Sequence, residues 1–290
     1  LTPSVGDADY LGAGDTTGTT TGNVGRFIPD HFTLSAGALA NRGGTCPGSN
    51  FTYLDEGLNL QLTLKAESAG GGATRNYDGS LDGGGYAKLT PGTFSNYGIG
   101  ARSGTTNLTS RITGAICTPT PSWTSGELGM LLPVLTASVT VVARTAMPSP
   151  LRDGPWTGTQ FGIAPQDSDT VQLQTAMLDM NVDGAGGNDH QAVGAPTELR
   201  FGRLRLHNAY GSELLPLPIP MTVQYWNGTA FITNAADSCT PLLPGNIGFD
   251  NYTPNLSTGE TAPAVGAAFN AGVGSLILSA PGPGNNGSVD

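Results

Sequence analysis

The sequence predicts an all-β protein made of two sandwich-like, immunoglobulin-like domains that are joined near residue 150. The chain of 290 residues is long enough for two ordinary domains. Its 44 glycines and 21 prolines favour turns, and only 12% of its residues are charged, so helix-forming Glu and Lys are scarce. Several short segments also alternate apolar with polar residues, which is the period of a half-buried strand. We therefore expect many short strands and long loops rich in Gly, Thr and Asn.

The first strands are expected after an N-terminal linker or arm, residues 1–25, which is rich in Gly and Thr and has little to bury. The first β-sandwich domain is predicted over residues 26–148. Leucines alternate with polar residues over 58–64, which places the leucines on one face of a strand. A second strand is expected over 134–144. The two are separated by Gly-rich loops.

The domain boundary is predicted at residues 147–155, "MPSPLRDGP", because three prolines and a glycine break any regular element there. The second β-sandwich domain then covers 155–290. In "LRFGRLRL" the apolar alternation slips by one position at Gly202, which predicts a β-bulge. Beyond it, Arg203 and Arg205 share the opposite, solvated face.

Three further strand signals follow in the second domain. Met221, Val223 and Tyr225 alternate along one predicted strand. The dipeptide Asn227-Gly228 is typical of a hairpin turn, and aromatic residues flank it on both sides. The segment "VGSLILSAPG" near the end predicts a last strand. No amphipathic helix of useful length is visible.

Composition and charge narrow the classes of function. The net charge of −10 disfavours nucleic acid or an anionic membrane as a partner. No run of about 18 apolar residues exists, so no membrane insertion is expected. Few lysines and much Thr, Gly and Asn are typical of a secreted protein at a cell surface.

The three cysteines, Cys46, Cys117 and Cys239, lack the C-x-x-C spacing of zinc and redox sites. Their number fits one disulfide and one remaining thiol. Cys46 and Cys117 fall in the same predicted domain, so we expect these two to be joined. Cys239 is then free, or paired with a cysteine outside this chain.

The stretch "DMNVDGAGGNDH", residues 179–190, begins like a calcium loop. Ligands two residues apart can curl around one ion, and the glycine allows the backbone to turn sharply. His190 stands where a calcium loop of the EF-hand type has Glu, so either Asp189, one place earlier, or a distant carboxylate would have to close the shell. The predicted ligands of a structural calcium ion are Asp179, Asn181, Asp183, Ala185 and Asp189. An Asp- and Asn-rich turn without an ion explains the same residues, and both interpretations stay open here.

Catalytic motifs are missing. The three histidines, His31, His190 and His207, have no recognisable nucleophile or metal motif around them. Asp55 and Glu56 are adjacent and would point to opposite faces of a strand, which does not suit a glycosidase pair. We therefore expect a non-catalytic module, with a secreted glycan hydrolase built from distant residues as the second alternative.

A carbohydrate-binding module is the first alternative, because exposed aromatic rings stack on sugars. The candidates are Trp123, Trp156, Trp226, Tyr225 and Tyr252. Packing inside a hairpin is the competing interpretation for Trp226, which stands beside the predicted turn. Surface glycans are thus one class of expected partner.

Six segments together resemble the C-terminal region of the MshQ-like proteins, which are large secreted β proteins encoded with a mannose-sensitive haemagglutinin type IV pilus. The segments are "GRFIPDHF", "FTYLDEGLNLQLTLKA", "NYDG…YAKL", "FGIAPQDSD", "LRFGRLRLHNAYGSELLPLPIPMTVQYWNGTAFITNAADSCT" and "GVGSLILSAPGPGNNGSVD". The resemblance runs from about Gly25 to Asp290.

This resemblance implies a structural or adhesion module with pilus or surface-fibre subunits as partners, and it brings no catalytic residues. The family's chains continue past the position of Asp290, so the second domain is expected to be truncated at its C-terminus. An unpaired sheet edge left in this way would favour self-association.

Overall fold

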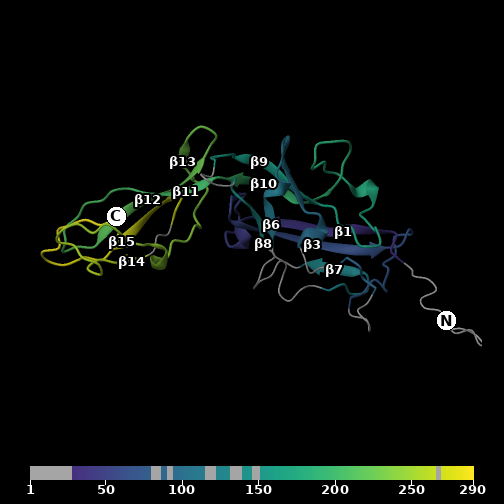
Figure 1. Ribbon diagram of the computed structural model, residues 1–290, viewed down its shortest axis with the longest axis horizontal. Helices are drawn as coiled ribbons and strands as arrows, with labels where there is room; N and C mark the ends of the chain where they lie inside the picture. Colours follow the sequence, from purple (N-terminus) through teal and green to yellow (C-terminus); the bar gives the residue numbers. More distant parts are fainter. Residues whose placement is uncertain are drawn as a thin grey trace, which may run out of the picture.

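The protein is described by a computed structural model that covers residues 28–79, 86–89, 94–114, 122–130, 139–145, 151–265 and 269–290. The predicted arm over 1–25 and Cys117 lie outside these residues. Three sheets form two units that lie end to end along the long axis of the molecule (Figure 1). The all-β prediction is confirmed.

The first unit is a sandwich of two sheets. One sheet has the order β1-β3-β8-β6, with β7 also pairing with β3, and the other has the order β2-β10-β9-β4-β5. The strands of the first sheet are β1 (His31–Ala40), β3 (Gly57–Glu67), β6 (Ile112–Gly114), β7 (Glu127–Met130) and β8 (Val139–Val142). Those of the second are β2 (Phe51–Tyr53), β4 (Gly100–Ser103), β5 (Thr106–Asn107), β9 (Trp156–Ile163) and β10 (Gln191–Arg200). All pairs are antiparallel except β2 with β10.

The core of this unit lies between the two sheets. The alternating leucines of 58–64 form the inner face of β3, and each is at most 2% exposed, as the sequence predicts. They belong to one cluster with Phe161, Val193 and Leu199 of the facing sheet. Burying each such side chain contributes about 2 kcal/mol, so this layer dominates the stability of the unit.

The second unit is built on one sheet of order β11-β12-β15-β14, with β13 also pairing with β12. Its core is small and contains Met221, Val223, Phe269, Leu276 and Leu278. Loop residues around Leu242 and Phe249 cover part of the sheet's apolar face. The strands are β11 (Gly202–Leu206), β12 (Leu217–Trp226), β13 (Phe231–Thr233), β14 (Pro263–Val265) and β15 (Val273–Leu278).

The boundary between the units lies near Phe201, and the prediction of 147–155 was wrong. Strands β9 and β10 follow that Pro-rich segment, yet they pair with β4 and β2 of the first unit. The predicted bulge at Gly202 is corrected for the same reason. β10 ends at Arg200 in one sheet and β11 begins at Gly202 in another, so the slip in alternation marks a change of sheet.

The remaining strand predictions are confirmed within the described residues. The hairpin joins β12 to β13 through four residues, and the side chain of Asn227 accepts hydrogen bonds from two backbone N–H groups of the turn. The last predicted strand is β15. The only helices in the described part are 3-10 segments of three or four residues, and none is long and apolar enough to cross a membrane. They are η2 (Asn41–Gly44), η3 (Phe94–Tyr97), η4 (Thr109–Arg111), η5 (Thr175–Met177) and η6 (Pro244–Asn246).

Candidate functional site

A disulfide joins the two units. It connects Cys46, just after η2, to Cys239, in the loop that follows β13, across a sequence separation of 193 residues. The predicted pair Cys46–Cys117 with a free Cys239 is therefore wrong. That prediction assumed that both partners lie in the same domain, whereas the turn after η2 faces the neighbouring unit.

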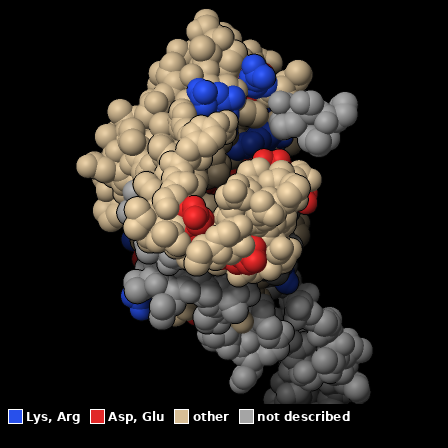
Figure 2. Space-filling model, turned by 90° about the vertical axis from the view of Figure 1, so that its left-hand side faces the viewer, with Lys and Arg blue, Asp and Glu red and all other residues tan. Residues whose placement is uncertain are grey.

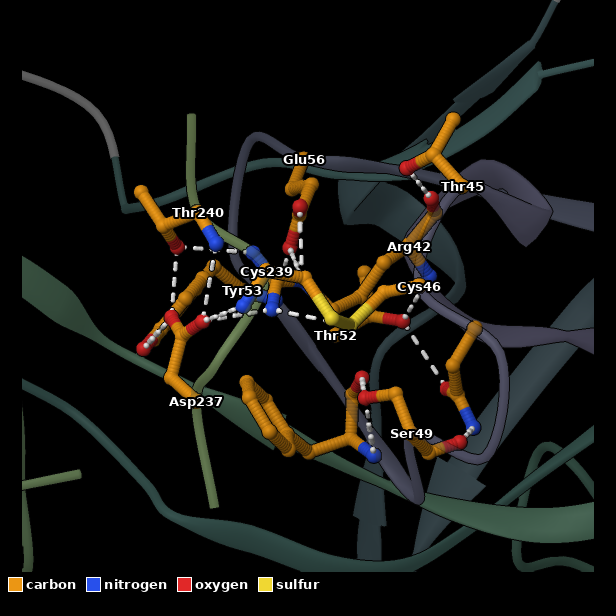
Figure 3. Close-up of polar contacts among 12 residues, drawn as sticks. Arg42, Thr45, Cys46, Ser49, Thr52, Tyr53, Glu56, Asp237, Cys239 and Thr240 are labelled. Atoms are coloured by element: carbon orange, nitrogen blue, oxygen red, sulfur yellow. Dashed lines mark hydrogen bonds and ion pairs between the residues drawn. A yellow bond between two sulfur atoms is a disulfide. The ribbon is translucent and has the colours of Figure 1, made fainter. Parts of the chain in front are cut away.

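Arg42 is the centre of the polar contacts around this disulfide (Figure 3). It lies in η2 with φ of 53°, a left-handed conformation that is uncommon for residues other than glycine. Its guanidinium donates to Glu56 at 2.9 Å, to Asp237 at 2.9 Å and to Thr240 at 2.8 Å. Arg42 is only 4% exposed, so its charge, which comes from the first unit, is buried against residues of the second unit.

Asp237 is the partner of Arg42 in the second unit and is completely buried. Its Oδ1 accepts hydrogen bonds from the backbone N–H groups of Cys239 and Thr240, both at 3.0 Å. Its Oδ2 accepts the hydroxyl of Tyr53 at 2.8 Å and that of Thr240. The carboxylate thus receives donors from both units, including the backbone N–H of the disulfide cysteine Cys239 and that of the next residue, Thr240 (Figure 3).

These contacts keep Asp237 ionised. Burial alone would raise its pKa, but the hydrogen bonds from Thr240, Cys239 and Arg42 outweigh burial and lower the pKa to about 2. Burial opposes the charge of Arg42 as well, yet the bonds and charges of Glu56 and Asp237 raise its pKa above the ordinary value for arginine. The two groups therefore form a permanent ion pair at neutral pH.

A second arginine extends the network. Arg200, at the end of β10, donates from Nη1 to the side chain of Asn234, and Asn234 donates to the hydroxyl of Tyr53. The same guanidinium binds Glu198 through Nε and Nη2, each at 2.9 Å. Arg200 and Tyr53 belong to the first unit and Asn234 to the second, so this chain of bonds also crosses the junction.

Arginine side chains stack on aromatic rings throughout this junction. Among the described residues, every such stack involves one of five arginines here: Arg42, Arg144, Arg152, Arg200 and Arg203. Their guanidinium carbons lie 3.7 to 5.5 Å from ring centroids. Each stack contributes on the order of 0.5–2 kcal/mol, more where water is excluded. Basic charge is thus concentrated at the junction of an acidic protein.

A hollow of about 240 Å³ opens beside the network. Arg42, Glu56 and Arg144 line it from the first unit, and Leu204 and Phe269 line it from the second. The view along the long axis, onto the end formed by the second unit, shows basic side chains in its upper part and at its lower left, with acidic ones between them (Figure 2). Arg144, which lines the hollow, is not free: it forms an ion pair with Asp55 at 3.1 Å and donates to the carbonyl of Gly202 at 2.9 Å.

Two family models match the chain on either side of this junction. The third domain of DUF6701 matches residues 1–194, and the fourth domain of DUF6701 matches residues 200–290. The chain belongs to the DUF6701 family. No curated protein and no solved structure matches it. The gap between the two DUF6701 domains falls at the end of β10, where the chain changes from one sheet to the next.

The predicted calcium loop of this DUF6701 chain is a turn closed by the bridge between Met180 and His190. Its side-chain oxygens accept backbone hydrogen bonds: Asp179 from Ala192, Asn181 from Gly184, Asp183 from Ala185, and Asp189 from Val182 and Asp183. Ala185 offers its carbonyl to the amide of Asn181. In the described part of the chain, no three His, Cys, Asp or Glu side chains converge on a point where a metal could bind. The oxygens thus serve the turn itself, and calcium binding stays a prediction.

The tryptophans predicted for sugar stacking have other contacts. Trp123 is 1% exposed and donates its indole N–H to the carbonyl of Leu89 inside the first core. Trp226 meets Phe231 edge to face and lies under Arg152, and Tyr225 lies under Arg200. Trp156 packs against the first core. Tyr252 is half-buried in a loop of the fourth domain.

The histidines and the other acidic residues are dispersed. His31 is buried beside Asp30 and Glu67, His190 contacts Asp189, and His207 follows β11. Asp55 and Glu56 do point apart, one toward Arg144 and the other toward Arg42. The structure does not bring these groups together in one site.

Arg42 and Asp237 were missed by the sequence reasoning. The run Asp237-Ser-Cys-Thr contains a local signal, because an Asp followed by free backbone N–H groups two and three residues later often accepts both. The two glycines after Arg42 signal a left-handed turn. Neither local signal predicts that Arg42 and Asp237 contact each other.

Proposed function

We propose that this DUF6701 chain is a rigid, non-catalytic structural segment of an extracellular surface protein, in which the third and fourth domains are held in one fixed orientation. The observation that carries the proposal is the junction itself. A disulfide, a buried ion pair and the stacks of Arg152 on Trp226 and Phe231 and of Arg200 on Tyr225 all cross between the units. Disulfides persist in oxidising compartments, which supports an extracellular location.

The state of the charged groups supports a structural role over a catalytic one. The guanidinium of Arg42 donates from Nε, Nη1 and Nη2 to Glu56, Asp237 and Thr240. Asp237 accepts bonds on both of its oxygens. A catalytic group needs a pKa near the working pH, whereas the contacts here move the pKa values of Asp237 and Arg42 away from neutrality.

The biological setting is proposed from the resemblance in sequence. We infer that the chain belongs to a pilus-associated or cell-surface protein of the MshQ-like type and supports adhesion or assembly with other fibre subunits. A fixed joint suits this setting, because a surface fibre transmits force and resists proteases better when its domains do not swing. Secretion of the chain is part of this proposal.

Small-angle X-ray scattering tests the fixed joint. The wild-type chain should fit a single end-to-end arrangement, and the variant Cys46→Ser/Cys239→Ser with Arg42→Ala should require a range of inter-unit angles. A matched control replaces Arg75, an exposed residue of the first unit, by Ala and should scatter like the wild type. Wild-type data that require many orientations would contradict the proposal.

A glycan array on the same chain separates adhesion to sugars from scaffolding alone. Saturable binding that survives in Cys46→Ser/Cys239→Ser would assign adhesion to one domain rather than to the joint. Turnover of any glycan would replace the structural proposal with the hydrolase alternative.

A further inference from the structure

Within the part of the chain that the structure describes, one edge of the fourth-domain sheet is open. β11 is the first strand in the order β11-β12-β15-β14 and pairs only with β12 among the described residues. The opposite edge, β14, begins with Pro263 and has a register shift against β15, and both features protect an edge from further pairing. β11 contains no proline and pairs with β12 without a shift.

The direction of the free backbone groups follows from the ladder. The N–H of Trp226 donates to the carbonyl of Phe201, and the N–H of His207 donates to the carbonyl of Pro220, both at 2.9 Å. In an antiparallel pair the bonded positions alternate, so the N–H and C=O groups of Gly202, Leu204 and Leu206 point away from β12. Arg144 already donates to the outward carbonyl of Gly202. The groups of Leu204 and Leu206 have no partner among the described residues.

The apolar face is incomplete at the same edge. Leu204 and Leu206 lie opposite Val223 and Met221, which are 4% and 1% exposed, so all four share the apolar face of the sheet. Leu204 and Leu206 are nevertheless 38% and 54% exposed. Leu204 also lines the hollow at the junction. Nearly half of the exposed large hydrophobic side chains of the described residues fall in the same hairpin, namely Leu204, Leu206, Tyr210, Leu214 and Leu215.

The charge on the other face of β11 indicates which kind of strand could pair with this edge: a second copy of β11 or an acidic segment. Arg203 and Arg205 lie opposite Gln224 and Thr222, on the face away from the leucines. Arg205 makes no hydrogen bond or ion pair with the described residues. Antiparallel pairing of β11 with the β11 of a second copy would place arginines opposite arginines, and like charges across strands are destabilising. Charge complementarity therefore favours an acidic strand.

We propose that the β11 edge is a docking site for an extended acidic segment of another protein chain, in which apolar residues alternate with Asp or Glu. The segment adds as a further strand to the free groups of Leu204 and Leu206. Its apolar side chains cover these leucines and extend the apolar face, and its carboxylates face Arg203 and Arg205. This mode of recognition takes affinity from main-chain bonds and specificity from alternate side chains.

The test uses the full chain and synthetic peptides of nine residues. A peptide alternating valine and glutamate should bind saturably by isothermal titration calorimetry, whereas one alternating valine and lysine should not. The glutamate peptide with N-methyl groups on alternate residues should fail to bind, because it lacks the donors for strand addition. Equal binding of the first two peptides, or no binding of the glutamate peptide at about 1 mM, would overturn the proposal.

Two variants locate the site. Arg205→Glu should weaken the glutamate peptide at least about threefold and admit the lysine peptide, since one cross-strand pair changes from attraction to repulsion. Arg75→Glu changes the net charge equally from an exposed position in the other unit and should have no effect. Leu204→Pro removes the outward N–H together with the leucine side chain, leaves the bonds to β12 in place and should abolish binding, with folding checked by circular dichroism.

A separate measurement tests whether a second copy of the chain is the occupant. Analytical ultracentrifugation should show no dimer that depends on β11. A concentration-dependent dimer that Leu204→Pro abolishes would assign the edge to self-association and overturn the proposal.

Discussion

Replacing Asp237 by Asn is the sharpest test of the junction, because it removes one charge while preserving size. Asn keeps an oxygen for Arg42, Cys239 and Thr240. Its amide nitrogen, however, replaces the Oδ2 that accepts the hydroxyls of Tyr53 and Thr240. The variant therefore places a donor against two donors in a site that is completely buried.

The lowered pKa of Asp237 sets the lower limit of the expected loss in the free energy of unfolding. Lowering the pKa of Asp237 from its ordinary value of 3.8 to about 2 corresponds to about 2 kcal/mol of stability at neutral pH. Breaking a buried ion pair by removing one partner costs about 3–5 kcal/mol. We therefore expect Asp237→Asn to lower the free energy of unfolding by about 2–5 kcal/mol, or the melting temperature by at least about 4 °C.

The dependence on pH provides a second signature of the same group. The folded pKa of Asp237 lies below its unfolded value, so its contribution is present above about pH 4 and is lost as the pH falls toward about 2. Asp237→Asn has no such proton to bind. The difference in stability between wild type and variant should therefore shrink over this range.

Urea unfolding at pH 7, 4 and 2.5, followed by tryptophan fluorescence, measures both quantities. Asp250→Asn is the matched control, because it removes the same charge from an exposed residue of the same unit. A stability of Asp237→Asn within about 0.5 kcal/mol of wild type at pH 7 would refute the reasoning. A difference that stays constant between pH 4 and 2.5 would refute the assignment of the pKa.

Three further outcomes are expected. Non-reducing peptide mapping should link Cys46 to Cys239, and Cys46→Ser/Cys239→Ser should lose up to about 5 kcal/mol of stability, the chain-entropy figure for a separation of 193 residues. Calcium is expected from the sequence to raise the melting temperature, and Asp183→Ala to abolish that rise; an unchanged curve would leave 179–190 as the hydrogen-bonded turn. Leu62→Ala should cost about 2–5 kcal/mol in thermal unfolding, because Leu62 is fully buried, whereas Thr63→Ala on the other face of β3 should cost much less.

The strands that sequence predicted well are those whose signal is local. The leucines of 58–64 predict both β3 and its buried face, because the period of two belongs to the strand itself. The turn at Asn227-Gly228 predicts the β12–β13 hairpin, since Asn and Gly tolerate the backbone angles of the turn. These properties depend on a few consecutive residues and do not change with the rest of the fold.

The same kind of signal misplaced the domain boundary. The prolines over 147–155 do interrupt regular structure, and this is all that a local signal can state. Whether the next strand joins the old sheet or begins a new one depends on which edge is available to pair with it. β9 pairs with β4, and β10 pairs with β2, so the first unit continues to Arg200.

What the sequence determined by itself is the all-β class, the faces of the clearest strands and the hairpin next to the junction. Only the tertiary structure decided that Cys46 meets Cys239 and that Arg42, 195 residues from Asp237, is its partner. A strand's period is set by the sterics of neighbouring residues. A buried ion pair or a disulfide is set by where two distant turns come to lie after both units have folded and docked.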